Sequence, residues 1–158
     1  MHNYIVPCIV LLASMRSLAV ISTSLLIGVA VGAQAEEYKG AADRIVDGDT
    51  FWICDDVACT KIRLCGIDAP ERGDAGYSEA TTALSDFLSD NFVHCIQVGG
   101  GTPCDGRSAP TNGDRVVAQC MAAGEDVASK LVNAGFACDW ERFSGGYYSL
   151  GDPAKLCH

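Results

Sequence analysis

The sequence has little positive charge, few histidines and no Cys-x-x-Cys pair. Its 11 Lys and Arg residues against 20 Asp and Glu residues argue against a protein that coats nucleic acid through bulk charge. Three histidines and the missing Cys-x-x-Cys spacing argue against a zinc site and a thioredoxin-type redox site. Long polar tracts and fibrous repeats are also missing, and 49% of the 158 residues are hydrophobic, which predicts one globular domain.

Residues 1–35 have the three-part layout of a secretory signal peptide. The apolar run Leu18–Val31 follows Arg16 and precedes Ala33-Gln34-Ala35, a small-x-small cleavage site. A membrane anchor is the alternative, although a comfortable span needs about 20 apolar residues. The first 14 residues contain no Lys or Arg, so Met15 is a candidate for the true start. We expect an exported protein, periplasmic or secreted, with no membrane contact after cleavage.

The domain expected after cleavage, residues 36–158, is acidic and rich in cysteine. Arg16 is the one charged residue before it, so its net charge is −10 where the whole chain has −9. Its even number of cysteines predicts up to four disulfides in an exported chain, with 105 possible pairings. Cys54 and Cys59 flank a predicted turn and are placed to close a hairpin. The eight cysteines are Cys54, Cys59, Cys65, Cys95, Cys104, Cys120, Cys138 and Cys157.

The hydrophobic pattern of this domain predicts five short strands and two helices. The predicted strands are Arg44–Val46, Thr50–Cys54, Thr60–Cys65, Val93–Val98 and Arg115–Cys120. The predicted helices are about Ser78–Asp90 and Glu125–Ala134, and the long loops are Gly66–Asp74 and Gly99–Asp114. A helix between the third and fourth of five strands is the order of the OB-fold. We therefore expect an α+β protein: a five-stranded Greek-key barrel with two to three helices, stapled by disulfides.

Carboxylates gather in turns that adjoin the predicted strands. Asp49, Asp68 and Glu71 lie in such turns, and Arg63 lies on the strand between them. Each turn motif alone is typical of structural turns. A barrel brings the second and third strands together, however, and two carboxylates with a backbone carbonyl suit Ca²⁺ or Mg²⁺. An arginine beside such a cation is typical of phosphodiester hydrolysis, where it neutralises charge and clamps phosphate oxygens.

The segments Arg44–Thr50 and Ile62–Glu71 resemble the staphylococcal nuclease (thermonuclease) family. Weaker matches at Arg115–Ala118 and Gly124–Gly135 extend the resemblance over most of the chain, from roughly Arg44 to Tyr148. The resemblance implies an OB-fold endonuclease, a hydrolase with one Ca²⁺ ion. It also implies cleavage of DNA and RNA on the 5′-oxygen side, which leaves 3′-phosphate ends. We expect a monomer without a stable protein partner.

The resemblance also implies a role for each matching residue. Asp49 and Asp68 supply carboxylates to Ca²⁺, and Ala69 supplies its main-chain carbonyl. Glu71 orients the attacking water or takes its proton. Arg63 clamps the phosphate beside the metal.

The second arginine of the family departs from the usual pattern. Relatives read Asp-x-Tyr-Gly-Arg, whereas this chain reads Thr111-Asn-Gly-Asp-Arg115. Arg115 is the expected match because a predicted strand follows it; Arg107 is the rival, and no predicted strand follows that residue. The tyrosine is missing, and pairing between Asp114 and Arg115 would weaken the hold of this arginine on the transition state.

Aromatic residues after the second helix are candidates for stacking on bases. They are Trp140, Phe143, Tyr147 and Tyr148. Packing over the end of the barrel is an equally good interpretation. Relatives carry a longer last helix, whereas this chain ends at Cys157-His158, and we expect Cys157 to pair with Cys138. Cys95 and Cys120 lie on strands expected to be neighbours, so we expect a disulfide between them.

Two function classes remain open. The first is the exported Ca²⁺-dependent nuclease, and the alternative is a catalytically degenerate OB-fold module that binds nucleic acid, peptide or saccharide. The complete set of Asp49, Arg63, Asp68 and Glu71 favours the enzyme. The altered residues before Arg115 and the net charge of −10 favour the binding module. The two classes differ in whether Arg63 and Arg115 face the space that the carboxylates line.

Overall fold

The computed structural model describes residues 35–158. The predicted signal peptide, its membrane-anchor alternative and the candidate start at Met15 fall on residues 1–35. Apart from Ala35 they lie outside the described residues. Within the described part, no helix is long and apolar enough to cross a membrane.

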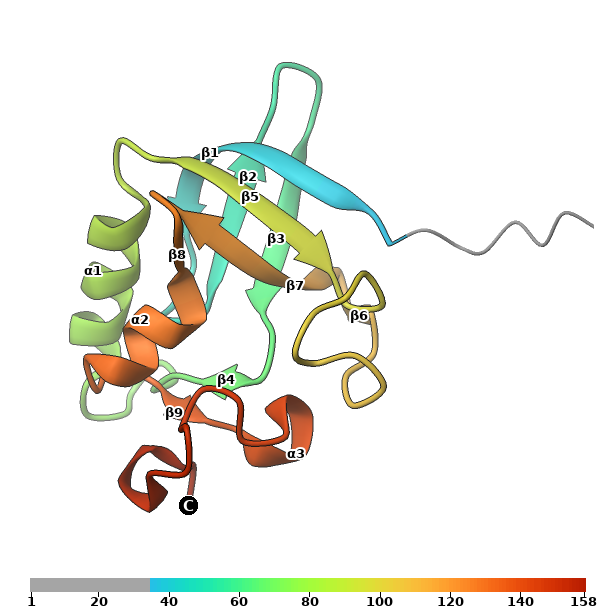
Figure 1. Cartoon of the computed structure of the whole chain (residues 1–158). Helices are drawn as coiled ribbons and strands as arrows, with labels where there is room; N and C mark the ends of the chain where they lie inside the picture. The colour runs from blue at the N-terminus through green and yellow to red at the C-terminus, as the bar shows by residue number, and fades with distance from the viewer. Residues whose placement is uncertain (1–34) are drawn as a thin grey trace, which may run out of the picture. The chain divides into compact units, whose positions relative to one another are not determined.

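Five strands close into a barrel (Figure 1). They are β1 (Glu37–Ile45), β2 (Thr50–Cys54), β3 (Cys59–Leu64), β5 (Phe92–Gln97) and β7 (Arg115–Ala122). Neighbours are antiparallel in the order β3-β2-β1-β5-β7, and a parallel pairing of β3 with β7 closes the barrel. Helix α1 (Tyr77–Leu88) separates the third and fourth barrel strands in the chain. The predicted α+β class and OB-fold barrel are therefore confirmed.

The barrel interior is filled by alternate residues of its strands. In β2, Phe51 and Ile53 are buried, and in β3, Ile62 and Leu64 are buried. Successive residues of a strand point to opposite faces. Arg63, between Ile62 and Leu64, therefore points away from the core, which frees its guanidinium for contacts outside the barrel.

Strand β1 begins at Glu37, well before the predicted start at Arg44. Its first half, Glu37–Ala41, pairs with β5, and its second half pairs with β2 across a register shift between Ala42 and Arg44. This segment contains Gly, Ala and charged residues, which have weak β propensity. The pairing partners rather than the local pattern set its conformation, and so the pattern predicted too short a strand.

Both predicted helices are present with different ends, and a third, short helix is added. Helix α2 (Val127–Asn133) is shorter than predicted because Glu125 and Asp126 form β8, which pairs with β7. The Asp126 carboxylate then caps the helix by accepting a hydrogen bond from the Ser129 N–H at 3.0 Å. Helix α3 (Glu141–Ser144) lies in the aromatic segment, and a 3₁₀ turn, η1 (Pro153–Lys155), lies near the C-terminus.

Two small pairings bring distant parts of the chain to one end of the barrel. Strand β4 (Ile67–Asp68) pairs with β9 (Cys138–Asp139), and β6 (Thr111–Asn112) pairs with the start of β7. Both β4 and β6 fall inside predicted loops, because two-residue strands carry no periodic signal. They place the aromatic segment beside Asp68 and the turn before Arg115 beside β3 (Figure 1).

Four disulfides link the described cysteines. Three were predicted: Cys54–Cys59, Cys95–Cys120 and Cys138–Cys157. The fourth, Cys65–Cys104, joins the end of β3 to the long loop before β6 and closes the largest loop, with a sequence separation of 39. The predicted disulfide staples are therefore present.

Candidate functional site

Asp49 is a buried carboxylate in the turn before β2. Its residue is 3% exposed. Its Oδ1 accepts a hydrogen bond from the Thr50 hydroxyl at 3.0 Å, and its Oδ2 accepts one from the Ala69 N–H at 3.1 Å. Gly48 allows this close approach, since a Cβ there would lie 2.7 Å from the Cβ atoms of Ala69 and Ala80. Gly48 thus has a packing role that the turn signal alone did not reveal.

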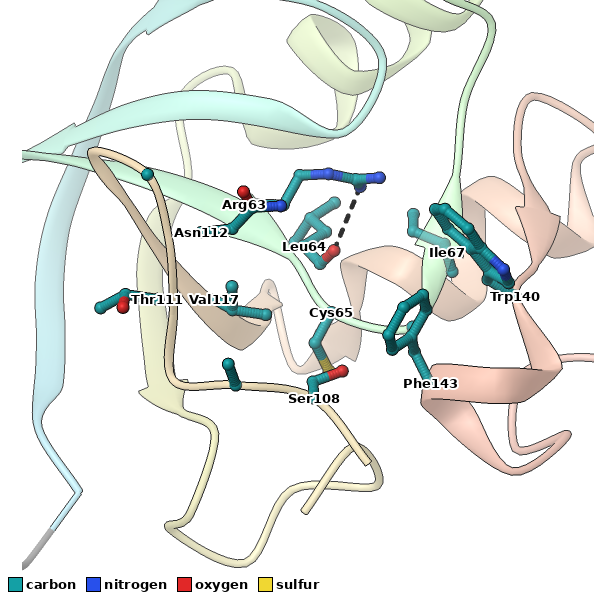
Figure 2. Close-up of a pocket in the computed structure, with 13 residues that line it drawn as sticks. Arg63, Leu64, Cys65, Ile67, Ser108, Thr111, Asn112, Val117, Trp140 and Phe143 are labelled. Carbon is teal, nitrogen blue, oxygen red and sulfur yellow. Dashed lines mark hydrogen bonds between the residues drawn. The ribbon is translucent and has the colours of Figure 1, made fainter. Parts of the chain in front are cut away.

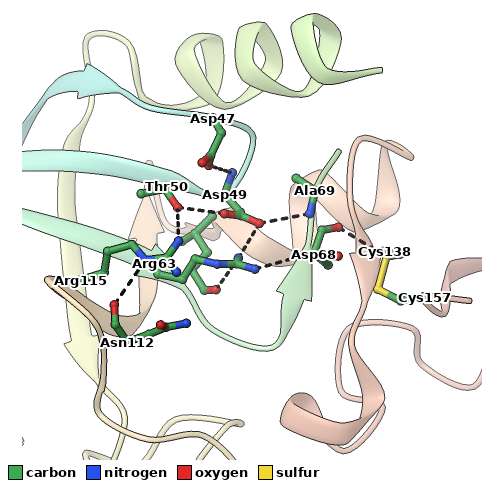
Figure 3. A network of polar contacts seen from close by, with 11 residues as sticks. Asp47, Asp49, Thr50, Arg63, Asp68, Ala69, Asn112, Arg115, Cys138 and Cys157 are labelled. Atoms are coloured by element: carbon green, nitrogen blue, oxygen red, sulfur yellow. Dashed lines mark hydrogen bonds and ion pairs between the residues drawn. A yellow bond between two sulfur atoms is a disulfide. The ribbon is translucent and has the colours of Figure 1, made fainter. Parts of the chain in front are cut away.

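Arg63 bridges the two carboxylates that were predicted to bind a metal. Its Nη1 lies 2.5 Å from Asp49 Oδ2, and its Nη2 lies 3.2 Å from Asp68 Oδ1 (Figure 3). The Arg63 side chain is 11% exposed. The guanidinium, two carboxylates and the Ala69 backbone therefore form one connected cluster.

Arg115 joins this cluster through Thr50. Its Nη1 donates to Thr50 Oγ1 at 3.4 Å, and its Nε donates to the Asn112 carbonyl at 3.4 Å (Figure 3). Thr50 was not among the predicted site residues, although it completes the Asp-Gly-Asp-Thr motif. Arg63 thus contacts Asp49 directly, and Arg115 is linked to Asp49 through the Thr50 hydroxyl.

Asp114 pairs with Lys61 rather than with Arg115. Lys61 Nζ lies 3.2 Å from Asp114 Oδ2, and no described carboxylate lies within ion-pair distance of Arg115. The described residues therefore do not show the expected ion pair between Asp114 and Arg115. The hydrogen bond from Lys61 also lowers the pKa of Asp114, which keeps this pair charged.

Glu71 and Arg107 lie outside the connected cluster. Glu71 is exposed in the turn after β4, and Asp74 holds this turn through reciprocal contacts with the Glu71 backbone at 3.2 and 2.9 Å. No hydrogen bond joins the Glu71 carboxylate to another described residue. Arg107 packs against Gly145, where a Cβ would lie 2.7 Å from its Nε. Arg115 rather than Arg107 is therefore the arginine beside Asp49.

The electrostatics of Asp49 suit an additional cation. Burial raises the pKa of Asp49 to about 7, and the opposing effects of Arg63, Thr50 and Ala69 leave it raised. Asp47 adds a further upward effect. A buried carboxylate whose desolvation outweighs the effect of its contact with Arg63 has a chemistry that fits a hard cation.

The ligands available for such a cation are few. No group of three or more His, Cys, Asp or Glu side chains in the described part of the chain could hold a metal ion. The donors predicted from the sequence are the Asp49 and Asp68 carboxylates and the Ala69 carbonyl, which would leave the remaining positions of a cation to water or substrate. Arg63 contacts both carboxylates, so a cation bound to the same oxygens would compete with its guanidinium.

A pocket of about 360 Å³ opens beside Arg63, and we call it the aromatic pocket (Figure 2). Trp140 and Phe143 line it, with ring centroids 4.8 Å apart in an edge-to-face arrangement. The backbone and side chains of the β6 region form the opposite wall. An open pocket with two aromatic rings beside an arginine is suited to a flat, negatively charged ligand.

The four predicted aromatic residues divide between the surface and the core. Trp140 is 40% exposed, and Tyr147 is 48% exposed but does not line the aromatic pocket. Tyr148 is 1% exposed, and its hydroxyl lies 3.6 Å from Cys65 Sγ in the core. The expectation that Tyr148 stacks on a base is therefore corrected: this ring closes the barrel end and presents no free face.

Comparison with other proteins gives one partial similarity. No protein-family model matches the chain. Micrococcal nuclease from Shigella flexneri is 34% identical over 75 residues, which cover 48% of this chain and 42% of that protein. The chain thus spans less than half the length of this curated relative. Together with the barrel, the similarity supports a relationship to that nuclease.

Proposed function

We propose that this protein is an exported, Ca²⁺-dependent nuclease of the staphylococcal nuclease family. It hydrolyses phosphodiester bonds of DNA and RNA and leaves 3′-phosphate ends. The observation that carries the proposal is the cluster in which Arg63 joins Asp49 and Asp68 while Arg115 reaches the same carboxylate through Thr50. A site that only binds has no need for two arginines and two carboxylates at one point.

The chain's own residues have distinct roles in this mechanism. Asp49, Asp68 and the Ala69 carbonyl would hold Ca²⁺, which when bound supplies positive charge for the phosphate oxygens and for the attacking water. Arg63, once released from the carboxylates, donates two hydrogen bonds from its planar guanidinium to two phosphate oxygens. Arg115 donates hydrogen bonds to the phosphate oxygens on which negative charge develops in the transition state.

Glu71 is the proposed general base. Its exposed carboxylate makes no hydrogen bond with other described side chains, so it is available to orient water and accept its proton. The water oxygen then bonds to phosphorus, and the bond from phosphorus to the 5′-oxygen breaks. The leaving oxygen takes up a proton from solvent, Glu71 returns its proton to solvent, and the phosphate stays on the 3′ end.

The aromatic pocket is the proposed site for a base beside the scissile phosphate. Trp140 and Phe143 supply its ring faces, and Tyr147 on the same segment is a second contact for the nucleic acid chain.

The net charge of −10 of residues 36–158 lowers the rate of encounter with a polyanion. It does not prevent cleavage, because charges beyond about 8 Å are screened at physiological salt. A monomer acting outside the membrane, in the periplasm or the medium, is part of the proposal.

A binding module on the same barrel is the second candidate. It is favoured by the engagement of Arg63 with both carboxylates, which leaves its guanidinium largely covered. Digestion of plasmid and single-stranded DNA by the oxidised protein, with Ca²⁺ and with chelator, separates the two candidates. We expect cleavage in the samples that contain Ca²⁺ and no cleavage in the samples that contain chelator. Binding without cleavage under both conditions would favour the module, and equal cleavage in chelator would refute the Ca²⁺ mechanism.

A further inference from the structure

A second pocket lies on the other side of the small β4–β9 sheet. Its volume is about 690 Å³, and Asp68, Glu71 and Lys155 line it. We call it the lysine pocket. Ile67 lines the aromatic pocket, and Asp68, the next residue, lines the lysine pocket. Because successive strand residues point to opposite faces, β4 separates the two pockets.

The Arg63–Asp68 ion pair of the connected cluster joins the linings of the two pockets. Arg63 lines the aromatic pocket, Asp68 lines the lysine pocket, and 3.2 Å separates Arg63 Nη2 from Asp68 Oδ1. A phosphodiester held at this ion pair has one substituent on each side. A nucleic acid chain that enters the aromatic pocket from the cluster therefore continues toward the lysine pocket in the other direction.

Lys155 is the cation of this second pocket. Its Nζ donates to Asn133 Oδ1 at 2.8 Å, a neutral partner at the end of α2. The other three lysines of the chain, Lys39, Lys61 and Lys130, each form an ion pair with a carboxylate. Among the described residues no carboxylate lies within 4.0 Å of Lys155 Nζ. Its charge is therefore free to interact with an anion.

The C-terminal tail holds Lys155 in the pocket that Asp68 and Glu71 also line. Two residues further on, Cys157 is bonded to Cys138, whose Sγ lies 3.4 Å from the Asp68 main-chain oxygen. The Cys157 N–H also donates to the Asp139 carbonyl at 3.0 Å. The remaining wall is mixed: it includes the polar residues Asp74 and Asn133 and the ring of Phe136, which can contact a base or a sugar.

We propose that the lysine pocket binds the nucleotide on the side of the scissile phosphate opposite to the aromatic pocket, with Lys155 contacting the next phosphate of the chain. This inference rests on the proposed nuclease function. It explains why an acidic protein keeps one unpaired lysine in a pocket shared with Asp68 and Glu71. The contact adds to substrate binding and leaves the bond-breaking step to the cluster.

The test uses Lys155→Met in the oxidised protein, with single-stranded DNA oligomers and Ca²⁺. We expect KM to rise roughly tenfold with kcat unchanged, and the slope of log KM against log salt to fall by about 0.7, the change for one lost phosphate contact on a single strand. Lys130→Met is the matched control, because Lys130 is paired with Glu125 and does not line the lysine pocket. Lys155→Arg keeps the charge and is expected to retain the wild-type KM.

A neutral methylphosphonate placed at each phosphate in turn locates the contact. One position next to the scissile bond is expected to raise KM for the wild type and to have no further effect in Lys155→Met. Equal KM values for Lys155→Met and Lys130→Met, with the wild type active, would overturn the inference and leave the nuclease proposal intact. A wild type that cleaves no oligomer would instead refute the proposed function.

Discussion

Lys61 Nζ lies 3.2 Å from Asp114 Oδ2, and this ion pair holds the acid that directly precedes Arg115. Lys61 lies on β3 and Asp114 lies in the turn between β6 and β7, so the barrel closure brings the two together. Arg115 is left with two neutral acceptors, the Thr50 hydroxyl and the Asn112 carbonyl. The aspartate in place of the usual glycine is therefore compensated by a lysine far away in the sequence.

Removing this lysine is expected to lower activity without touching the cluster. In Lys61→Met the Asp114 carboxylate loses its partner, and the adjacent Arg115 becomes the nearest cation available to it. We expect kcat/KM on single-stranded DNA to fall roughly fivefold, about 1 kcal/mol of transition-state stabilisation. The double variant Lys61→Met, Asp114→Asn is expected to recover the wild-type value. An unchanged single variant would show that Asp114 does not compete for Arg115.

Removing Arg63 is expected to separate metal binding from catalysis. Its guanidinium contacts both Asp49 and Asp68, so Ca²⁺ competes with it for the same oxygens. In Arg63→Met we expect Ca²⁺ affinity by calorimetry to rise roughly tenfold, or about 1.4 kcal/mol, and kcat to fall by at least 100-fold. The unpaired Asp49 also makes the protein less stable in chelator, with recovery of Tm on addition of Ca²⁺. Weaker Ca²⁺ binding by this variant would contradict the competition.

Gly48 is expected to tolerate no side chain. A Cβ at this position would lie 2.7 Å from the Cβ atoms of Ala69 and Ala80, so the turn that carries Asp49 must move. We expect Gly48→Ala to lower the free energy of unfolding by about 1–3 kcal/mol and to reduce activity. Gly124→Ala is the comparison: its φ of +81° makes it strained too, but no atom lies within 4 Å of the added Cβ. We expect both variants to unfold at lower urea concentration than the wild type, and only Gly48→Ala to lose activity.

The Gly99–Asp105 segment, which lies next to the Cys65–Cys104 disulfide, is expected to lose its hydrogen bonds to Asp105 at low pH. Partial burial raises the pKa of Asp105, but hydrogen bonds from the Thr102 hydroxyl and the Gly99 and Gly101 amides lower it by more. An acid with a lowered folded-state pKa stabilises the fold above its unfolded pKa, and this contribution is lost as pH falls through the folded-state value. We expect protection of both amides from hydrogen exchange to fall below about pH 4. Asp105→Asn is expected to remove this pH dependence, and an unchanged profile in that variant would contradict the assignment.

Strand β3 could be predicted because its apolar residues alternate with charged ones. Ile62 and Leu64 alternate with Lys61 and Arg63, and this pattern indicates both the strand and the face on which Arg63 lies. Strand β1 could not be predicted in full, because Glu37–Ala41 has no such alternation and depends on β5. The four-residue helix α3 and the strands β4 and β9 are likewise products of tertiary contact.

The site was predictable in its components and less so in its contacts. The two motifs identified Asp49, Arg63 and Asp68, which the fold brings into contact. The partner of Asp114 could not be read from local sequence, because Lys61 is 53 residues away. Tyr147 and Tyr148 are neighbouring residues of the same type, so the sequence does not distinguish them. Only packing against the core shows that the Tyr148 ring is buried and the Tyr147 ring is exposed.

The most direct test of the nuclease proposal compares the wild type with Glu71→Gln at saturating Ca²⁺. Cleavage of an end-labelled single-stranded oligomer is followed in one set of samples, and binding of the same oligomer by fluorescence anisotropy in another. We expect the cleavage rate to fall by about 10²- to 10⁴-fold, the range for loss of a general base, with affinity changed less than twofold. Equal cleavage rates, or no cleavage by the wild type, would contradict the proposed chemistry.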